Sequence, residues 1–153
     1  MNRKDPTIFE LLRREHRELE QRHDALRQAI DSPEYADLCG ALVRDLRAHE
    51  VIEERALGHA LAARAPDTPV VQELERAKEK MDDALHALTA ASTPSERQLA
   101  TTELGAQMRA HFELEEKSVF SATHFLFSPQ TQRAMRERLL RLRAEAPTAD
   151  PIG

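Results

Sequence analysis

The chain has 153 residues, of which 41% are hydrophobic and 32% are charged, and its formal net charge is −5. A chain of this length is expected to form one domain with a real core, and its modest, mixed charge offers no basic stripe for nucleic acid. There is no apolar run long enough to span a membrane and no secretory signal, so neither a membrane nor a nucleic-acid partner is expected. The single Cys39 cannot form an internal disulfide, which makes a reducing cytoplasm the expected location.

Five capping residues, each followed by proline, mark the starts of the predicted helices. They are Asp5, Ser32, Thr68, Thr93 and Ser128. An Asp, Ser or Thr side chain can accept a free backbone N–H at a helix start, and proline loses no hydrogen bond at the first helical position. Few glycines and abundant Ala, Leu, Glu and Arg also favour an all-α chain. The predicted helices cover residues 6–31, 33–65, 69–91, 94–127 and 129–145.

The connections between these helices are only a few residues long, so neighbouring helices should be antiparallel. The sequence therefore predicts an antiparallel up-down-up-down four-helix bundle with a short fifth C-terminal helix. The bundle is expected to occupy residues 1–146, followed by a flexible tail over residues 147–153.

The second predicted helix contains His49 and Glu53, which are four residues apart and therefore lie one above the other on one helix face. The fourth predicted helix repeats this pattern as His111 and Glu115, at an offset of 62 residues. Two such helices facing inward would place two imidazoles and two carboxylates around one point. These are the ligands of a metal site.

The same offset relates the first predicted helix to the third, so the chain resembles a duplicated helical hairpin. The first helix carries His16, and the aligned position of the third helix carries Lys78. One ligand position has therefore changed from histidine to lysine.

With these motifs, the chain resembles the hemerythrin-like, or HHE cation-binding, domain family. The resemblance covers roughly residues 6–145. It implies a bundle that holds a non-haem di-iron centre, with His16, His49, Glu53, His111 and Glu115 as metal ligands. It further implies that the two glutamates bridge two metals while the histidines cap them. No residue is assigned a catalytic role, since such a role would rest on family analogy alone.

Lys78 stands where the family has a histidine, and a buried ammonium beside carboxylates is expected to stay charged and not to ligate metal. Lys78 is therefore expected to line the site without ligating, and to pair with Glu53 or Glu115 if metal is absent. Asp82 and His86, one and two turns further on, are alternative ligands.

The remaining histidines are expected at the surface or rim, and Glu116 on a solvated charged face. These histidines are His23, His59 and His124.

Two functions follow from this interpretation. The first is a metal-binding protein that binds or senses oxygen, nitric oxide or peroxide, or handles iron; one or two ions are possible. Histidine and carboxylate ligands suit iron, manganese and zinc alike. The second is a metal-free bundle that binds a protein partner or acts in regulation. Both describe a binding or sensing protein in preference to an enzyme, and metal analysis separates them.

Overall fold

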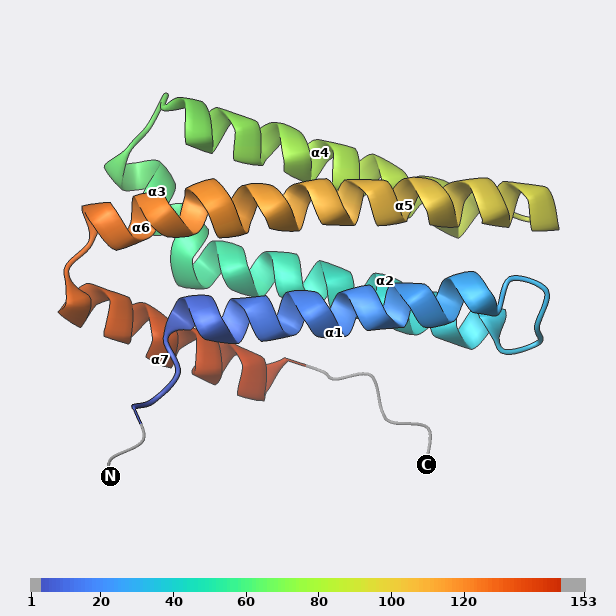
Figure 1. Cartoon of the computed structure of the whole chain (residues 1–153), viewed down its shortest axis with the longest axis horizontal. Coiled ribbons are helices and arrows are strands. Elements are labelled where there is room, and N and C mark those ends of the chain that lie inside the picture. Colours follow the sequence, from blue (N-terminus) through green and yellow to red (C-terminus); the bar gives the residue numbers. More distant parts are fainter. Residues whose placement is uncertain (1–3, 147–153) are drawn as a thin grey trace.

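The computed structural model describes residues 4–146, and these residues are helical almost throughout (Figure 1). No strand occurs among them, which confirms the all-α prediction. Two short segments, labelled η, are single π-helical turns. The elements are α1 (Ile8–Gln28), α2 (Tyr35–Glu53), η1 (Glu54–Gly58), α3 (His59–Arg64), α4 (Pro69–Ala90), α5 (Pro94–Leu114), η2 (Glu115–Val119), α6 (Phe120–Leu126) and α7 (Pro129–Glu145).

The two π-turns interrupt the second and fourth predicted helices without ending them. In η1 the N–H of His59 donates to the carbonyl of Glu54, and in η2 the N–H of Phe120 donates to the carbonyl of Glu115. Each bond spans five residues, as in a π-turn, and the α-helix resumes at once. The chain thus forms the five predicted helical segments, and the predicted tail, 147–153, lies outside the described residues.

Three of the five predicted capping residues stand directly at helix starts. Thr93 and Ser128 accept N–H groups of the first turn of α5 and α7, and Thr68 precedes α4. The first helix begins two residues later than predicted because Thr7, not Asp5, caps it. The second predicted helix begins at Tyr35, after a turn over residues 29–34. Pro33 therefore belongs to this turn and not to the helix.

The long helices lie side by side, with α1 next to α2 and α4 next to α5 (Figure 1). Helix α1 also packs on α5, and α7 packs along α1, α2 and η1. The C-terminal helix therefore covers one side of the bundle near the N-terminal end of α1.

Two separate apolar clusters form the core, and a polar layer lies between them. Along α1, Leu12 belongs to one cluster and Leu19 to the other, and His16 lies between them. Along α5 and η2, Phe112 and Val119 flank Glu115 in the same way. The fold thus buries ionisable side chains at mid-height of the bundle, where water is excluded.

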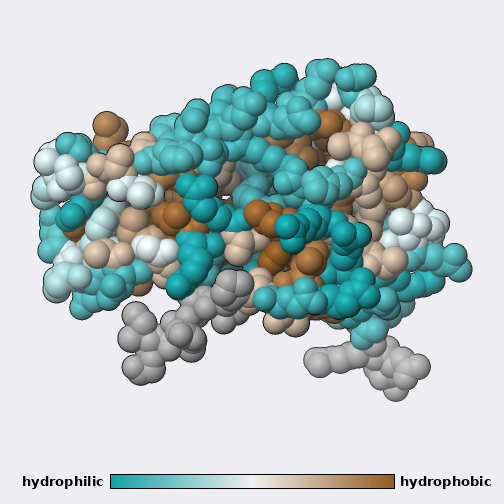
Figure 2. Space-filling view, turned by 180° about the vertical axis from the view of Figure 1, so that it is seen from behind, coloured by the Kyte–Doolittle hydropathy of each residue, from teal (hydrophilic) through white to brown (hydrophobic). Residues whose placement is uncertain are grey.

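Most of the outer surface is polar. Seen from behind, hydrophilic residues dominate, and hydrophobic residues appear between the rows of polar side chains (Figure 2). Within residues 4–146, no helix has a stretch that is both long and apolar enough to cross a membrane.

The expectation that His23 lies at the surface is wrong. Its side chain is buried, and its Nε2 lies 2.7 Å from the carbonyl oxygen of Thr101 on α5. The imidazole can reach this carbonyl because Gly105, one turn further along α5, has no side chain. A Cβ built on Gly105 would lie 2.4 Å from His23 Cε1. This contact is a close approach of α1 and α5, and nothing in the sequence of α1 alone indicates it.

Substituting Gly105 should therefore destabilise the bundle. We expect Gly105→Ala to lower the free energy of unfolding by about 1–3 kcal/mol, because the new methyl group overpacks against His23. Gly40→Ala is the matched control: Gly40 lies within α2, and a Cβ added there would have nothing within 4 Å. That change should stabilise by about 0.5–1 kcal/mol through helix propensity. Urea denaturation of both variants tests this, and equal stabilities would refute the close approach.

Candidate metal centre

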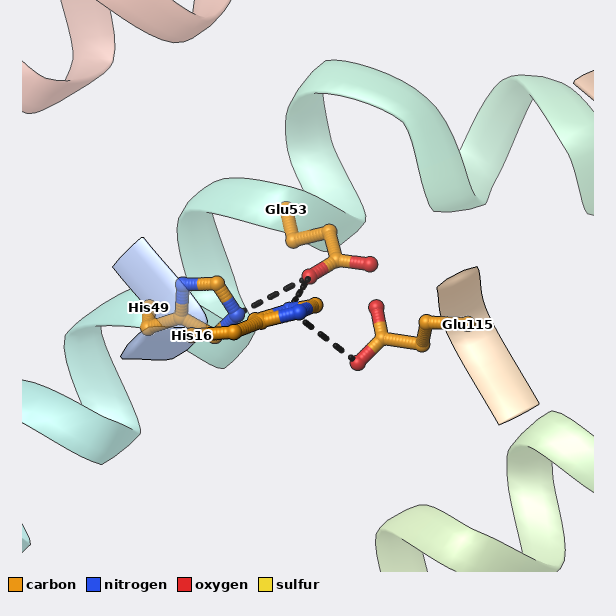
Figure 3. Close-up of side chains that lie close together, drawn as sticks. All are labelled: His16, His49, Glu53 and Glu115. Carbon is orange, nitrogen blue, oxygen red and sulfur yellow. Dashed lines mark ion pairs between the residues drawn. The ribbon is translucent and has the colours of Figure 1, made fainter. Parts of the chain in front are cut away.

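Four buried side chains from three segments of the chain meet in the polar layer. They are His16 from α1, His49 and Glu53 from α2, and Glu115 from the start of η2; Figure 3 shows the two imidazoles and two carboxylates converging. One ligand atom from each lies within 4.8 Å of the others. Four donors within this distance can surround one cation.

The distances between these groups are short where they lie on one helix. His49 Nε2 lies 3.0 Å from Glu53 Oε2, as expected for positions i and i+4. His16 Nε2 lies 3.8 Å from Glu53 Oε2 and 3.8 Å from Glu115 Oε1 (Figure 3). His16 therefore sits between the two carboxylates and joins the halves of the bundle.

His111 belongs to a second, adjacent group of donors. Its Nε2 lies 2.7 Å from Glu115 Oε1 and 3.3 Å from Glu50 Oε1. Glu50, His111 and Glu115 also have one ligand atom each within 4.8 Å of one another. Glu115 is thus shared by both groups. The sequence interpretation missed Glu50, because its place directly after His49 does not say which helix its side chain faces.

Carboxylates outside the centre hold the outer nitrogens of two histidines. His16 Nδ1 lies 3.2 Å from Glu116 Oε2, and His49 Nδ1 lies 3.0 Å from Glu15 Oε1. Arg143 of α7 in turn donates to Glu15. Such partners fix the orientation of an imidazole and leave Nε2 directed inward. Glu116 was expected on a solvated face, and the structure instead places it against His16.

The ring of His16 is also fixed by stacking. It lies parallel to Phe112, with ring centroids 4.0 Å apart and an interplanar angle of 7°. The sequence interpretation missed this role for Phe112, which follows His111 directly and reads as an ordinary core residue.

Several inward-facing atoms of the two groups make no well-directed hydrogen bond among the described residues, although His49 Nε2 and Glu115 Oε1 have ionisable neighbours at 3.0 and 2.7 Å. These atoms are His16 Nε2, His49 Nε2, Glu50 Oε1 and both oxygens of Glu115. A buried carboxylate without a partner costs several kcal/mol, so such atoms call for a proton or a cation. Imidazole nitrogens and carboxylate oxygens are the donors that iron, manganese and zinc accept. The residues present therefore fit a bound divalent cation.

The pKa shifts reflect burial opposed by close partners. Burial disfavours charge on Glu53, but the imidazoles of His16 and His49 outweigh it and hold the pKa of Glu53 well below its usual range. Burial likewise opposes charge on His49, yet Glu15 and Glu53 raise its pKa to about 10. His49 and Glu53 thus form an ion pair when no cation is present.

The second group has the opposite balance. Burial raises the pKa of Glu50 to about 7 and lowers the pKa of His111 to about 4. At neutral pH the imidazole of His111 is therefore uncharged, which is the form that ligates metal. This group has less internal charge compensation than the first.

The structure does not place the helix-three candidates among the donors. Lys78 Nζ lies 3.6 Å from Glu54 Oε1, so the expected ion pair with Glu53 or Glu115 does not form. The reason is position: Lys78 is partly exposed at the rim of the bundle, where Glu54 is the nearer carboxylate. Asp82 pairs with Arg47, and the His86 side chain is 67% exposed. Neither Asp82 nor His86 can serve as the missing ligand in this arrangement.

By its fold and site, the protein is a helical bundle in which two inward-facing His-x-x-x-Glu pairs surround a candidate cation-binding centre. A family model described as the hemerythrin HHE cation binding domain matches residues 7–123, and the chain belongs to this family. Helix α7, with Arg143, lies beyond the matched residues. Neither the curated proteins nor the solved structures gave a match to the chain.

Removing Glu15 should weaken cation binding without touching a donor atom. We expect Glu15→Ala to lower the affinity for Zn²⁺ by about 10–100-fold, because His49 loses the partner that orients it. Glu18→Ala is the control, since Glu18 is an exposed glutamate on the same helix. Competition with a chromophoric chelator gives both affinities. Equal affinities for the two variants would show that Glu15 does not orient His49.

Proposed function

We propose that this chain is a hemerythrin-like protein that binds non-haem iron at His16, His49, Glu53 and Glu115. The observation that carries the proposal is the convergence of four buried imidazole and carboxylate side chains whose inward-facing atoms make few well-directed hydrogen bonds. Nothing in a purely structural core explains why such atoms should face one another, because burial without partners is costly. Manganese and zinc suit the same donors and are the alternative metals.

The bundle has properties that suit a small ligand. Bound iron would supply the redox and ligand-binding chemistry needed to bind or sense oxygen, nitric oxide or peroxide. The chain supplies the enclosure: apolar clusters above and below the polar layer exclude bulk water. Glu15 and Glu116 hold the two imidazoles, so donor atoms are oriented before the cation arrives. We place the protein in the cytoplasm, as an oxygen or nitric oxide sensor or an iron-handling protein.

The same proposal includes the topology of the family. In it, the four long helical segments form an antiparallel up-down-up-down bundle, and Lys78 occupies the position of a helix-three histidine. The short links between α1 and α2 and between α4 and α5 support this arrangement. The lysine leaves α4 without a ligand in either donor group.

A second candidate is a metal-free bundle that binds a protein partner. One observation favours it: His49 and Glu53 already lie within ion-pair reach at 3.0 Å, and the pKa of His49 is raised to about 10. This pair compensates part of the buried charge without a cation. Metal content separates the two candidates.

Metal content after anaerobic reconstitution with Fe²⁺ tests the proposal. We expect the wild-type protein to retain at least one iron per chain after gel filtration. The double variant His16→Ala/His49→Ala should retain none at the first donor group, because two of its four ligands are gone. His86→Ala is the control, since this exposed histidine lies outside both groups.

The contrary result is equally clear. A folded wild-type protein that retains neither Fe²⁺, Mn²⁺ nor Zn²⁺ would overturn the proposal and favour the metal-free candidate. Equal iron loss in His86→Ala and in the double variant would place the metal elsewhere.

A further inference from the structure

We propose that Glu50 of α2 supplies the ligand that α4 lacks, so that the second cation position of the centre is held by Glu50, His111 and Glu115. The inference rests on the proposed function, since it places this site directly beside the first. It differs from the ligand set that the sequence resemblance implied, because Glu50 was not among those residues. The new element is a carboxylate one residue after His49, facing the other half of the bundle.

The geometry of the three donors carries the inference. His111 Nε2 lies 3.3 Å from Glu50 Oε1 and 2.7 Å from Glu115 Oε1, so one imidazole faces two carboxylates from different segments. Glu53, the i+4 partner of His49, turns to the first group, whereas Glu50 turns to His111. Glu53 therefore belongs to the first donor group and Glu50 to the second, and the two groups share Glu115.

Burial shows that this is not a surface cluster of acids. His111 and Glu115 are each only 1% exposed at their side chains, and Glu50 is 20% exposed. Both oxygens of Glu115, and Oε1 of Glu50, lack a hydrogen-bond partner in the described part of the chain. The Glu115 carboxylate can hold two cations by giving one oxygen to each, although His16 and His111 both face its Oε1 in this structure.

A groove between α2 and α4 gives this site an open side. It has a volume of about 310 Å³ and is lined by Glu50 together with residues of both helices. Water entering the groove can complete the coordination of a cation that has only three protein ligands. Of the donors in the two groups, only Glu50 lines this groove. The groove residues besides Glu50 are Arg47, Val51, Glu54, Lys78, Met81, Asp82 and Leu85.

The donor set indicates which cation this second site takes and how tightly. One imidazole and two carboxylates make it richer in oxygen than the first group, which suits Mn²⁺ or Fe²⁺. The second site has three protein ligands, one fewer than the first group. Lys78 also lines the groove, and its positive charge acts on Glu50. Two cations should therefore bind in two steps, the second weaker than the first.

Manganese binding measured by equilibrium dialysis, with electron paramagnetic resonance to count free Mn²⁺, tests the site. The wild-type protein should bind two Mn²⁺ per chain. Glu50→Gln should keep the tight step and weaken the other by more than about tenfold, because it loses a charged ligand. Glu54→Gln is the matched control: it removes the same charge from the next helical turn, but Glu54 lies outside both donor groups. Lys78→Gln should strengthen the second step severalfold.

Each other outcome decides against the inference. A single Mn²⁺ per wild-type chain, or none, overturns the second site. The proposed function stands or falls separately, on whether the same protein retains iron after reconstitution. If Glu50→Gln binds two cations as tightly as the wild-type protein does, Glu50 is not a ligand. If this variant binds no cation, Glu50 serves the first site and not the second. Equal loss in Glu50→Gln and Glu54→Gln would assign the effect to net charge.

Discussion

The constraint on which this structure depends is the burial of Glu115. Its carboxylate is fully enclosed, and neither oxygen has a hydrogen-bond partner among the described residues. A carboxylate in such a place must be balanced by positive charge or a proton. His16 Nε2 and His111 Nε2 lie 3.8 and 2.7 Å from its Oε1, but burial keeps His111 uncharged at neutral pH by lowering its pKa. The two apolar clusters can close above and below this layer only if the charge inside it is compensated.

From that centre, interactions extend outward in an ordered way. The inner nitrogens of His16 and His49 face the carboxylates, and their outer nitrogens face Glu116 and Glu15. Arg143 on α7 ends one of these chains of contacts. The C-terminal helix therefore does more than cover apolar side chains, because it supports the residue that orients His49. The two π-turns begin at or directly after Glu115 and Glu53, and π-turns within α-helices are frequent at functional sites.

Sequence patterns were sufficient for the helical fold and for the family. The proline starts indicated the five helical segments, because capping is a local interaction between neighbouring residues. The inner residues followed from the spacing of His49 and Glu53 and its repetition. Local patterns say nothing of which neighbouring helix a side chain faces, and this is why the residues around the predicted ligands were missed. They are Glu15, Glu50, Phe112, Glu116 and Arg143.

Two of the wrong expectations, those for His23 and Lys78, have the same physical origin. The partner of His23 lies on α5, beside a glycine that no pattern on α1 reveals. Lys78 pairs with Glu54 because it lies at the rim of the bundle, and helical spacing does not determine how far from the bundle axis a residue lies.

The central claim is that a cation binds between His16, His49, Glu53 and Glu115, at the centre of the polar layer. The most direct test is an anomalous difference map from crystals grown with Fe²⁺ and measured at the iron absorption edge. The account predicts a peak about 2.0–2.3 Å from the Nε2 atoms of the two histidines and from oxygens of both carboxylates. A map with no peak among these four side chains, from crystals in which iron is found only at the surface or not at all, would contradict it.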